Sequence, residues 1–162
     1  GACSCVRVQG ANRLGTNSLL DLLVFGIAAG NHIVEFNSTT THKPLPLDAA
    51  DKSLARIARL DNANDGEYAQ DVANDLRAAM QQHAGVFRTQ AIMDEGVTKI
   101  AALRARVNSI GLKDKSKIFN TARIEALEVE NLIEAAQATI VSAAARKESR
   151  GAHSVDDFGD KP

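Results

Sequence analysis

Residues 89–110 read T-Q-A-I-M-D-E-G-V-T-K-I-A-A-L-R-A-R-V-N-S-I, and their apolar spacing decides the fold. Within it, the apolar residues Ile100, Leu103, Val107 and Ile110 are spaced by three, four and three residues. This spacing is typical of the buried face of a helix in a bundle. Two more long segments, 67–84 and 120–147, have helical spacing as well. Because short loops join the three segments, we expect an antiparallel three-helix bundle.

The ends of these segments carry recognisable helix signals. Asn120 or Thr121 can cap the start of the last helix, and Gly111 is expected to end the one before it. A shorter helix is expected at residues 48–60, followed by a polar turn. The side chains expected to face inward are Tyr68, Val72, Leu76, Met80 and His83, then Ile92, Ile100, Leu103, Val107 and Ile110, then Ile124, Leu127, Leu132, Ile133, Ala136 and Ile140.

The composition agrees with a mainly α chain. Of 162 residues, 44% are hydrophobic and only 4% are aromatic, which favours helices over a sheet sandwich. The formal charge of −1 gives no net attraction to nucleic acid or to an anionic membrane. No run approaches the roughly 18 apolar residues of a spanning helix, so we expect no direct membrane insertion. The histidines and the pair Cys3 and Cys5 lack metal-ligand spacing, so no metal site is expected.

The first 36 residues predict a different unit. Residues 5–9 alternate as a short strand does, and a loop with two glycines follows at residues 10–15. Asn17 or Ser18 is expected to cap the next helix, which is apolar nearly all round and therefore typical of a helix buried on most sides. This strand–loop–helix unit has nothing in the rest of the chain to bury its helix against, which points to a missing partner.

The apolar helix is expected to reach residue 33. Residues 37–47 are polar and contain Pro44 and Pro46, which predicts a linker and a domain boundary.

Two features around the glycine-flanked loop could bind a ligand. The start of the helix near Ser18 carries free N–H groups, which favour an anion or the polar edge of a cofactor. Arg13, just before it, could hold a carboxylate through two parallel hydrogen bonds. Spacing alone leaves open that Arg13 is a surface arginine and that Ser18 is a plain helix cap.

Separated segments, in the right order, resemble the succinate dehydrogenase/fumarate reductase flavoprotein family, and L-aspartate oxidases share a related version of the first. They are G-A-N-R-L-G-T-N-S-L-L-D-L at 10–22, H-A-G-V-F-R-T at 83–89, F-N-T-A-R at 119–123, and R-K-E-S-R-G-A-H at 146–153 followed by Asp156, Asp157 and Phe158. The resemblance therefore covers essentially the whole chain.

This resemblance implies the C-terminal portion of a FAD-dependent succinate dehydrogenase flavoprotein subunit. Arg13 would bind a carboxylate of succinate or fumarate, Ser18 and Leu19 would contact FAD, and no catalytic acid or base is expected within this chain. The complete enzyme would oxidise succinate to fumarate and pass electrons to an iron–sulfur subunit. It would lie at the cytoplasmic face of a bacterial inner membrane or at the matrix side of the mitochondrial inner membrane.

The resemblance also implies a domain organisation. Its parts are the edge of a FAD-binding domain at 1–36, a linker at 37–47, a helical bundle domain at 48–150, and the start of a C-terminal tail or domain at 151–162. The strand–loop–helix would then be a remnant of a flavin-binding α/β domain. Arg150 is expected to tie the end of the bundle to that domain.

Several positions depart from the family pattern. Ala2 stands where the family usually has a glutamate that contacts the flavin's adenosine part, and Gln9 stands where it usually has histidine. No G-x-G-x-x-G phosphate loop occurs, so we expect the chain alone to have no dehydrogenase activity. Two alternatives remain open: a non-catalytic helical interaction module split from such a subunit, and a fumarate reductase or L-aspartate oxidase relative.

Overall fold

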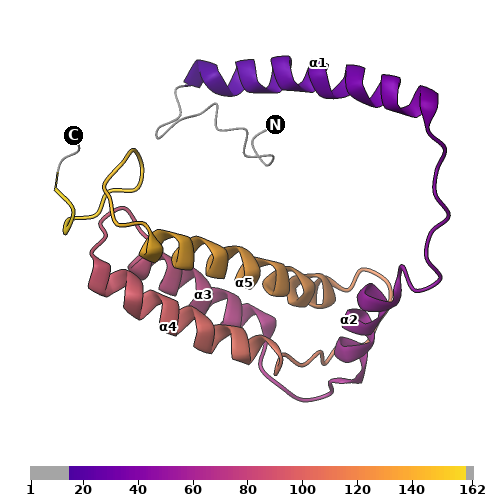
Figure 1. Cartoon of the computed structure of the whole chain (residues 1–162). Helices are drawn as coiled ribbons and strands as arrows, with labels where there is room; N and C mark the ends of the chain where they lie inside the picture. The colour runs from indigo at the N-terminus through magenta and orange to yellow at the C-terminus, as the bar shows by residue number, and fades with distance from the viewer. Residues whose placement is uncertain (1–14, 160–162) are drawn as a thin grey trace. The chain divides into compact units, whose positions relative to one another are not determined.

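A computed structural model describes residues 15–159 of the chain. These residues form five helices and no strand, so the predicted mainly α class is confirmed. The helices are α1 Gly15–Thr39, α2 Asp51–Asn62, α3 Ala69–His83, α4 Gln90–Val107 and α5 Thr121–Ala145 (Figure 1). The predicted strand at 5–9, with Cys5 in it and Cys3 before it, lies outside the described residues.

The chain divides into two compact units, which are described separately. Of the described residues, one unit contains 15–47 and 150–152, and the other contains 48–149 and 153–159. The first unit holds α1, and the second holds α2 to α5.

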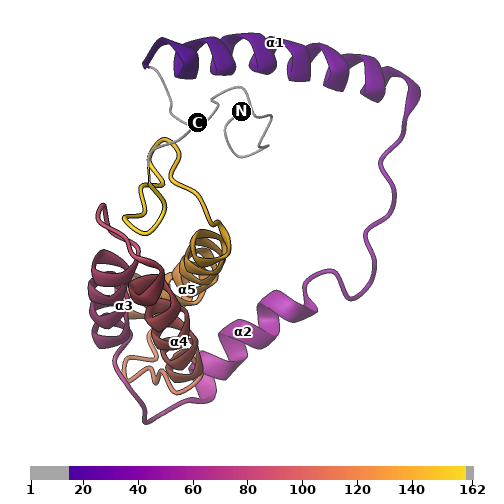
Figure 2. The ribbon, with the colours of Figure 1, turned by 60° about the vertical axis from the view of Figure 1, so that its left-hand side comes forward.

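Helices α3, α4 and α5 pack against one another, and α2 packs against α5 (Figures 1 and 2). The loop at 84–89 joins α3 to α4, and the longer loop at 108–120 joins α4 to α5. The core between the helices consists mostly of aliphatic side chains, the largest of them being Leu60, Met93, Ile100, Leu103, Ile110 and Ile140. The predicted three-helix bundle is therefore confirmed, with the short helix α2 added at one end.

Three side chains predicted to face inward are exposed instead: Tyr68 at 55%, Ile124 at 55% and Leu132 at 44%. Tyr68 precedes α3, and its hydroxyl accepts a hydrogen bond of 2.6 Å from Lys113 Nζ at the surface. On α5 the buried stripe consists of Ala126, Val129, Ile133, Ala136 and Ile140. Alanines let the neighbouring helices approach, so the larger Ile124 and Leu132 are left at the flanks of the stripe.

The start of α5 agrees with the sequence prediction. Asn120 is the N-cap residue, and its Oδ1 accepts a hydrogen bond of 2.9 Å from the backbone N–H of Arg123. Its Nδ2 donates to the carbonyls of Asp114 and Ser116, which fixes the loop before the helix. Phe119 next to it has a φ of 51°, in the left-handed region that bulky residues rarely adopt.

Gly111 does not end α4, because the helix stops at Val107 with Asn108 as its C-cap residue. Gly111 is needed for a close backbone approach instead. A Cβ at this position would lie 2.7 Å from the carbonyl carbon of Asp65 and 2.8 Å from the backbone nitrogen of Gly66. This approach lets residues 67 and 110 form an isolated parallel bridge between the turn before α3 and the segment after α4.

Helix α1 is longer at both ends than predicted. It begins at Gly15, so Asn17 and Ser18 lie inside its first turn, and the prediction that one of them caps the helix is wrong. It also continues past residue 33 to Thr39, because no glycine or proline interrupts residues 31–43. The hydroxyls of Ser38, Thr39 and Thr40 donate to carbonyls of the last turn, which satisfies groups that a helix end leaves free.

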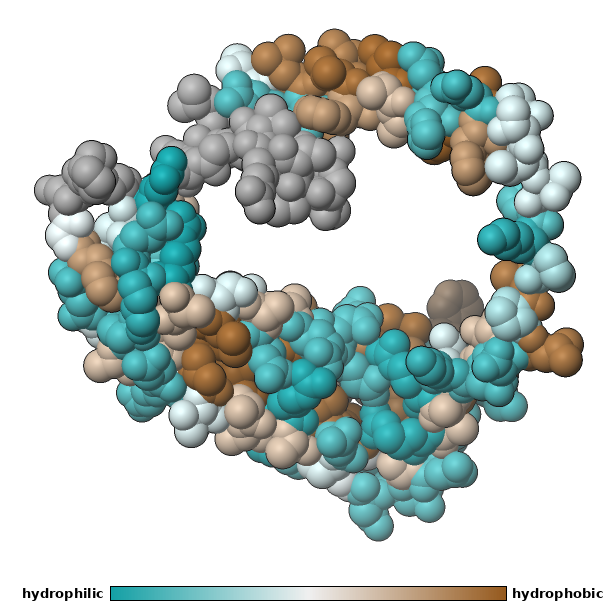
Figure 3. Space-filling view, viewed as in Figure 1, coloured by the Kyte–Doolittle hydropathy of each residue, from teal (hydrophilic) through white to brown (hydrophobic). Residues whose placement is uncertain are grey.

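Large apolar side chains of α1 are exposed in this chain (Figure 3). More than half of the surface is exposed for Leu19, Leu20, Leu22, Leu23, Val24, Ile27, Ile33, Val34 and Phe36. By length and composition alone, α1 could cross a membrane, which differs from the expectation that no segment approaches this limit. Asp21 and two glycines interrupt the apolar run, but its mean hydropathy stays high enough for a membrane-spanning helix. A core helix of a larger protein has the same composition, so the single helix is weak evidence for a span.

Candidate functional site

Two of the three sequence-predicted ligand residues, Ser18 and Leu19, lie at the start of α1. Arg13 lies outside the described residues, whereas Ser18 is half-buried in the first turn and Leu19 is 70% exposed. The Ser18 hydroxyl oxygen is buried and has no hydrogen-bond partner within residues 15–159. A hydroxyl can donate and accept, so this atom, together with the first-turn N–H groups, fits the polar edge of an organic cofactor.

Asp21 adds a polar group that sequence reasoning did not assign to the site. Its side chain is buried, with a relative exposure of 3%, although it belongs to an otherwise exposed apolar helix. Its Oδ1 has no hydrogen-bond partner among the described residues. Since residues three apart lie on one helix face, Ser18 and Asp21 each contribute an oxygen without a described partner to the same face of α1. The only sequence signal was a lone carboxylate within an apolar run.

Two of the recognised motif segments meet at one end of the bundle. The Arg88 guanidinium lies 3.0 Å from His153 Nδ1 and also donates to the carbonyls of Gly85 and Ala84. Because arginine only donates, His153 Nδ1 accepts, and its Nε2 carries the proton and donates to the Arg146 carbonyl at 3.0 Å. The histidine therefore joins the α3–α4 loop to the end of α5.

The residues after His153 complete this end of the bundle. Val155 is buried and forms a parallel bridge with Arg88, whose carbonyl accepts a hydrogen bond of 2.8 Å from the N–H of Asp156. The Asp157 carboxylate accepts from the backbone N–H of Gln90 in the first turn of α4, where the helix dipole favours a negative charge. We call residues 153–158 the closing segment. Its polar groups connect the α3–α4 loop, the start of α4 and the end of α5.

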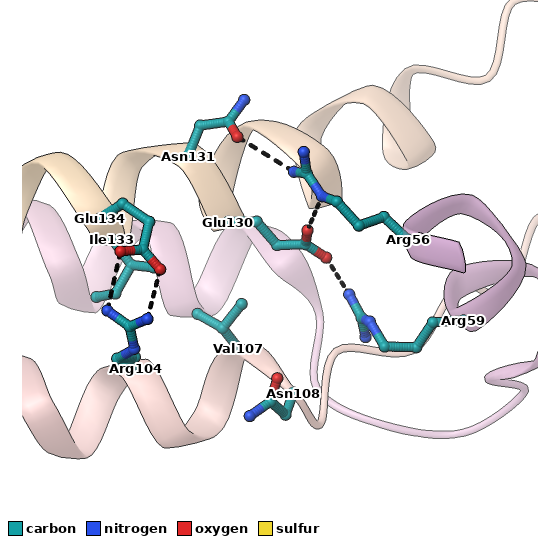
Figure 4. A pocket seen from close by; sticks show the side chains of 9 residues that line it. All are labelled: Arg56, Arg59, Arg104, Val107, Asn108, Glu130, Asn131, Ile133 and Glu134. Atoms are coloured by element: carbon teal, nitrogen blue, oxygen red, sulfur yellow. Dashed lines mark hydrogen bonds and ion pairs between the residues drawn. The ribbon is translucent and has the colours of Figure 1, made fainter. Parts of the chain in front are cut away.

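A pocket of about 420 Å³ opens between α2, α4 and α5 (Figure 4). It is lined by Arg56, Arg59, Arg104, Val107, Asn108, Glu130, Asn131, Ile133 and Glu134. Glu130 accepts from Arg56 at 2.6 Å and also from Arg59, while Arg104 pairs with Glu134 at 2.6 Å. Both glutamates of α5 that line the pocket, Glu130 and Glu134, are thus held in ion pairs.

The arginines of α2 in this pocket were not singled out from the sequence. Arg56 and Arg59 are three residues apart and therefore share a helix face, which was the available signal. Their partners on α5 are more than seventy positions away in the chain, so the pairing depends on the fold.

A further charged cluster joins the start of α3 to the end of α4. The Arg106 guanidinium donates to both carboxylate oxygens of Glu67, at 2.6–3.1 Å, and to Asp75 at 2.7 Å. The hydrogen bonds from Arg106 lower the pKa of Glu67, against a smaller opposing effect of burial, and those from Glu67 and Asp75 raise the pKa of Arg106. No group of three or more histidine, cysteine, aspartate or glutamate side chains in the described part of the chain is arranged to hold a metal ion.

Comparisons with known proteins agree on one family. Residues 73–161 match the sequence model described as fumarate reductase flavoprotein C-term. The succinate dehydrogenase flavoprotein subunits of Rickettsia bellii and Coxiella burnetii are 43% and 46% identical over 99% of this chain. A solved structure of E. coli quinol fumarate reductase has a TM-score of 0.85 and 33% identity over 100% of this chain. The chain spans 27% to 28% of the length of these proteins.

Proposed function

Since this chain belongs to the family of fumarate reductase and succinate dehydrogenase flavoproteins, we propose that it forms the C-terminal part of a succinate dehydrogenase flavoprotein subunit. The observation that carries the proposal is a resemblance of sequence and fold along the whole chain, α1 included. The apolar exposure of α1 supports it, because the remaining length of such a subunit would cover that helix.

In this proposal the start of α1 forms one edge of a site for FAD and a dicarboxylate. The unpaired hydroxyl of Ser18 supports a polar contact with the flavin, and the exposed Leu19 offers apolar surface beside it. Arg13 would hold a substrate carboxylate by two parallel hydrogen bonds, which orients the substrate and neutralises its charge. The chemistry that bound FAD supplies is acceptance of a hydride from the dicarboxylate.

The partners and location follow from the same premise. The remainder of the flavoprotein would complete the cofactor site, and an iron–sulfur subunit would receive the electrons. Such a complex is membrane-associated, at the cytoplasmic face of a bacterial inner membrane or the matrix side of the mitochondrial one. Within the chain, residues 1–36 would be the edge of the FAD-binding domain, 37–47 the linker, 48–150 the helical domain and 151–162 the start of the C-terminal part.

The test uses the complete flavoprotein that contains this chain. Arg13→Gln is expected to lower kcat/KM for succinate by about 100-fold or more, because an oriented charged contact to the substrate is lost. Bound flavin, followed by its visible absorbance, should stay unchanged in that variant. Ser18→Ala should instead lower the flavin content. Arg77→Gln, an exposed change on α3, serves as the control for both measurements.

An unchanged kcat/KM in Arg13→Gln would remove the substrate role of that residue. The purified 162-residue chain alone should reduce no dye in the presence of succinate, and a measurable rate would contradict the division of the site between this chain and the rest of the subunit. If the native protein proves to be only this chain and carries no flavin, the alternative of a helical interaction module is favoured, since α2 to α5 have their own core.

A further inference from the structure

We propose that the pocket between α2, α4 and α5 binds one small oxyanion, a carboxylate or a phosphate group. This inference does not depend on the proposed function, because every residue it uses belongs to the bundle unit.

The charges of the pocket walls do not balance. Three guanidinium groups face it, from Arg56, Arg59 and Arg104, and only two carboxylates, from Glu130 and Glu134. The other polar lining residues, Asn108 and Asn131, are neutral. The lining therefore carries one positive charge that no lining residue balances, and a single anion would balance it.

One guanidinium nitrogen of the pocket lining is a donor without an acceptor among the described residues. Arg59 uses Nη2 to bind Glu130, but its Nη1 is buried and has no hydrogen-bond partner within residues 15–159. Arg56 donates through Nε to Glu130 and through Nη2 to Asn131 at 3.1 Å, and Arg104 binds Glu134 through both Nη atoms. The unbalanced charge and the unpaired N–H groups thus coincide at Arg59. Guanidinium N–H groups bind carboxylate and phosphate oxygens strongly and with defined geometry.

The shape of the pocket suits a small ligand. Val107 and Ile133 are buried and provide an apolar floor, and Figure 4 shows Val107 between the Arg104–Glu134 pair and the Glu130 pairs. Asn108 lies at the same pocket, and its side-chain amide has no partner among the described residues, so it can donate to a bound oxygen. A volume of about 420 Å³ suits a small molecule and leaves no room for a protein element.

The test follows thermal unfolding and calorimetric binding of the 162-residue chain in a buffer free of oxyanions. Sodium phosphate and sodium acetate are compared with sodium chloride at the same ionic strength, because chloride screens charge but lacks the oxygen geometry. Phosphate or acetate should raise the Tm more than chloride does, with a saturable dependence on concentration. The two salts also distinguish a phosphate site from a carboxylate site.

Arg59→Gln is expected to weaken binding of the preferred oxyanion by about tenfold or more, since a charged hydrogen-bond donor is removed. Arg59→Lys keeps the charge but not the forked donors, so it should weaken binding less, and it carries the test if the glutamine variant does not fold. Arg77→Gln, exposed on α3 away from the pocket, should bind as the unmodified chain does. The proposal is overturned if neither oxyanion exceeds chloride, or if Arg77→Gln and the Arg59 variants lose the same affinity.

Discussion

Glu67 shows how one residue ties two helices through charge. Its carboxylate receives three hydrogen bonds from Arg106 and one of 3.0 Å from the Ser109 hydroxyl. Arg106 lies in the last turn of α4 and Ser109 lies just after that helix, whereas Glu67 precedes α3. The hydrogen bonds need the ionised carboxylate, which is why they lower the pKa of Glu67 below 4.5.

The first prediction concerns the acid side of the stability profile. A carboxylate with a lowered pKa in the folded state adds stability above pH 4.5, and this contribution is lost as pH falls through the folded pKa. Glu67→Gln should therefore lower the urea midpoint at pH 7 and leave a smaller further drop between pH 7 and pH 3.5 than the unmodified chain shows. Glu95→Gln, on the exposed face of α4, is the matched control. Parallel pH profiles for Glu67→Gln and the unmodified chain would contradict the assignment.

At the scale of helices, the packing of α3 on α4 depends on Gly96. A Cβ at this position would lie 2.5 Å from Cβ of His83 and 3.1 Å from Cδ1 of Ile140. His83 cannot move away freely, because its Nδ1 is hydrogen-bonded to the Ile92 carbonyl at 3.0 Å. Gly96 therefore sets how closely the helices approach, at a site where α5 also contributes a side chain.

The second prediction is that Gly96→Ala destabilises the bundle by about 1–3 kcal/mol, the usual effect of overpacking a core. This loss runs against the gain that alanine gives in a helix interior, of about 1 kcal/mol. Gly159→Ala, where a Cβ meets nothing within 4 Å, should change stability little. Urea unfolding at pH 7 gives the free energy of unfolding of both variants. If Gly96→Ala were as stable as the control, α3 and α4 could move apart at this site without a loss of stability, and the prediction would be wrong.

The helices were predictable because their signals are local, whereas the sites depend on distant pairings. The spacing of Ile100, Leu103 and Val107 and the cap at Asn120 identified the bundle. The C-terminal end of α1 was misplaced because no glycine or proline follows residue 33 before Pro44, and hydroxyls at 38–40 bond the carbonyls near the helix end. The contacts of the closing segment were not predicted, since they join it to residues 88 and 90, more than sixty positions away. The role of Arg13 stays a prediction.

At the scale of the whole molecule, the two units differ in how they bury apolar surface. The unit with α2 to α5 has a continuous core from Leu60 to Val155. In α1, by contrast, Asp21 is the one buried residue within the described helix. An apolar helix without a core of its own depends on other protein surface or on lipid for its cover.

The third prediction is that residues 48–162 fold alone. This shortened chain should unfold in urea in one cooperative transition, with a midpoint close to that of the bundle in the 162-residue chain, because its core residues lie within it. It should also bind less of a hydrophobic dye, since the apolar surface of α1 is absent. A shortened chain with no cooperative transition would show that the bundle needs the first unit, and the proposed boundary at 47–48 would then be wrong.

The closing segment sets an order of events during synthesis. Helices α3 and α4 can pair once residue 107 has left the ribosome. Some fifty more residues must then be made before Asp157 can accept from the N–H of Gln90 and His153 can contact Arg88. Until then, the start of α4 in the nascent bundle lacks the contacts of the closing segment. A premature stop between residues 146 and 153 would release a polypeptide whose helices are all complete but whose bundle end lacks the contacts of the closing segment.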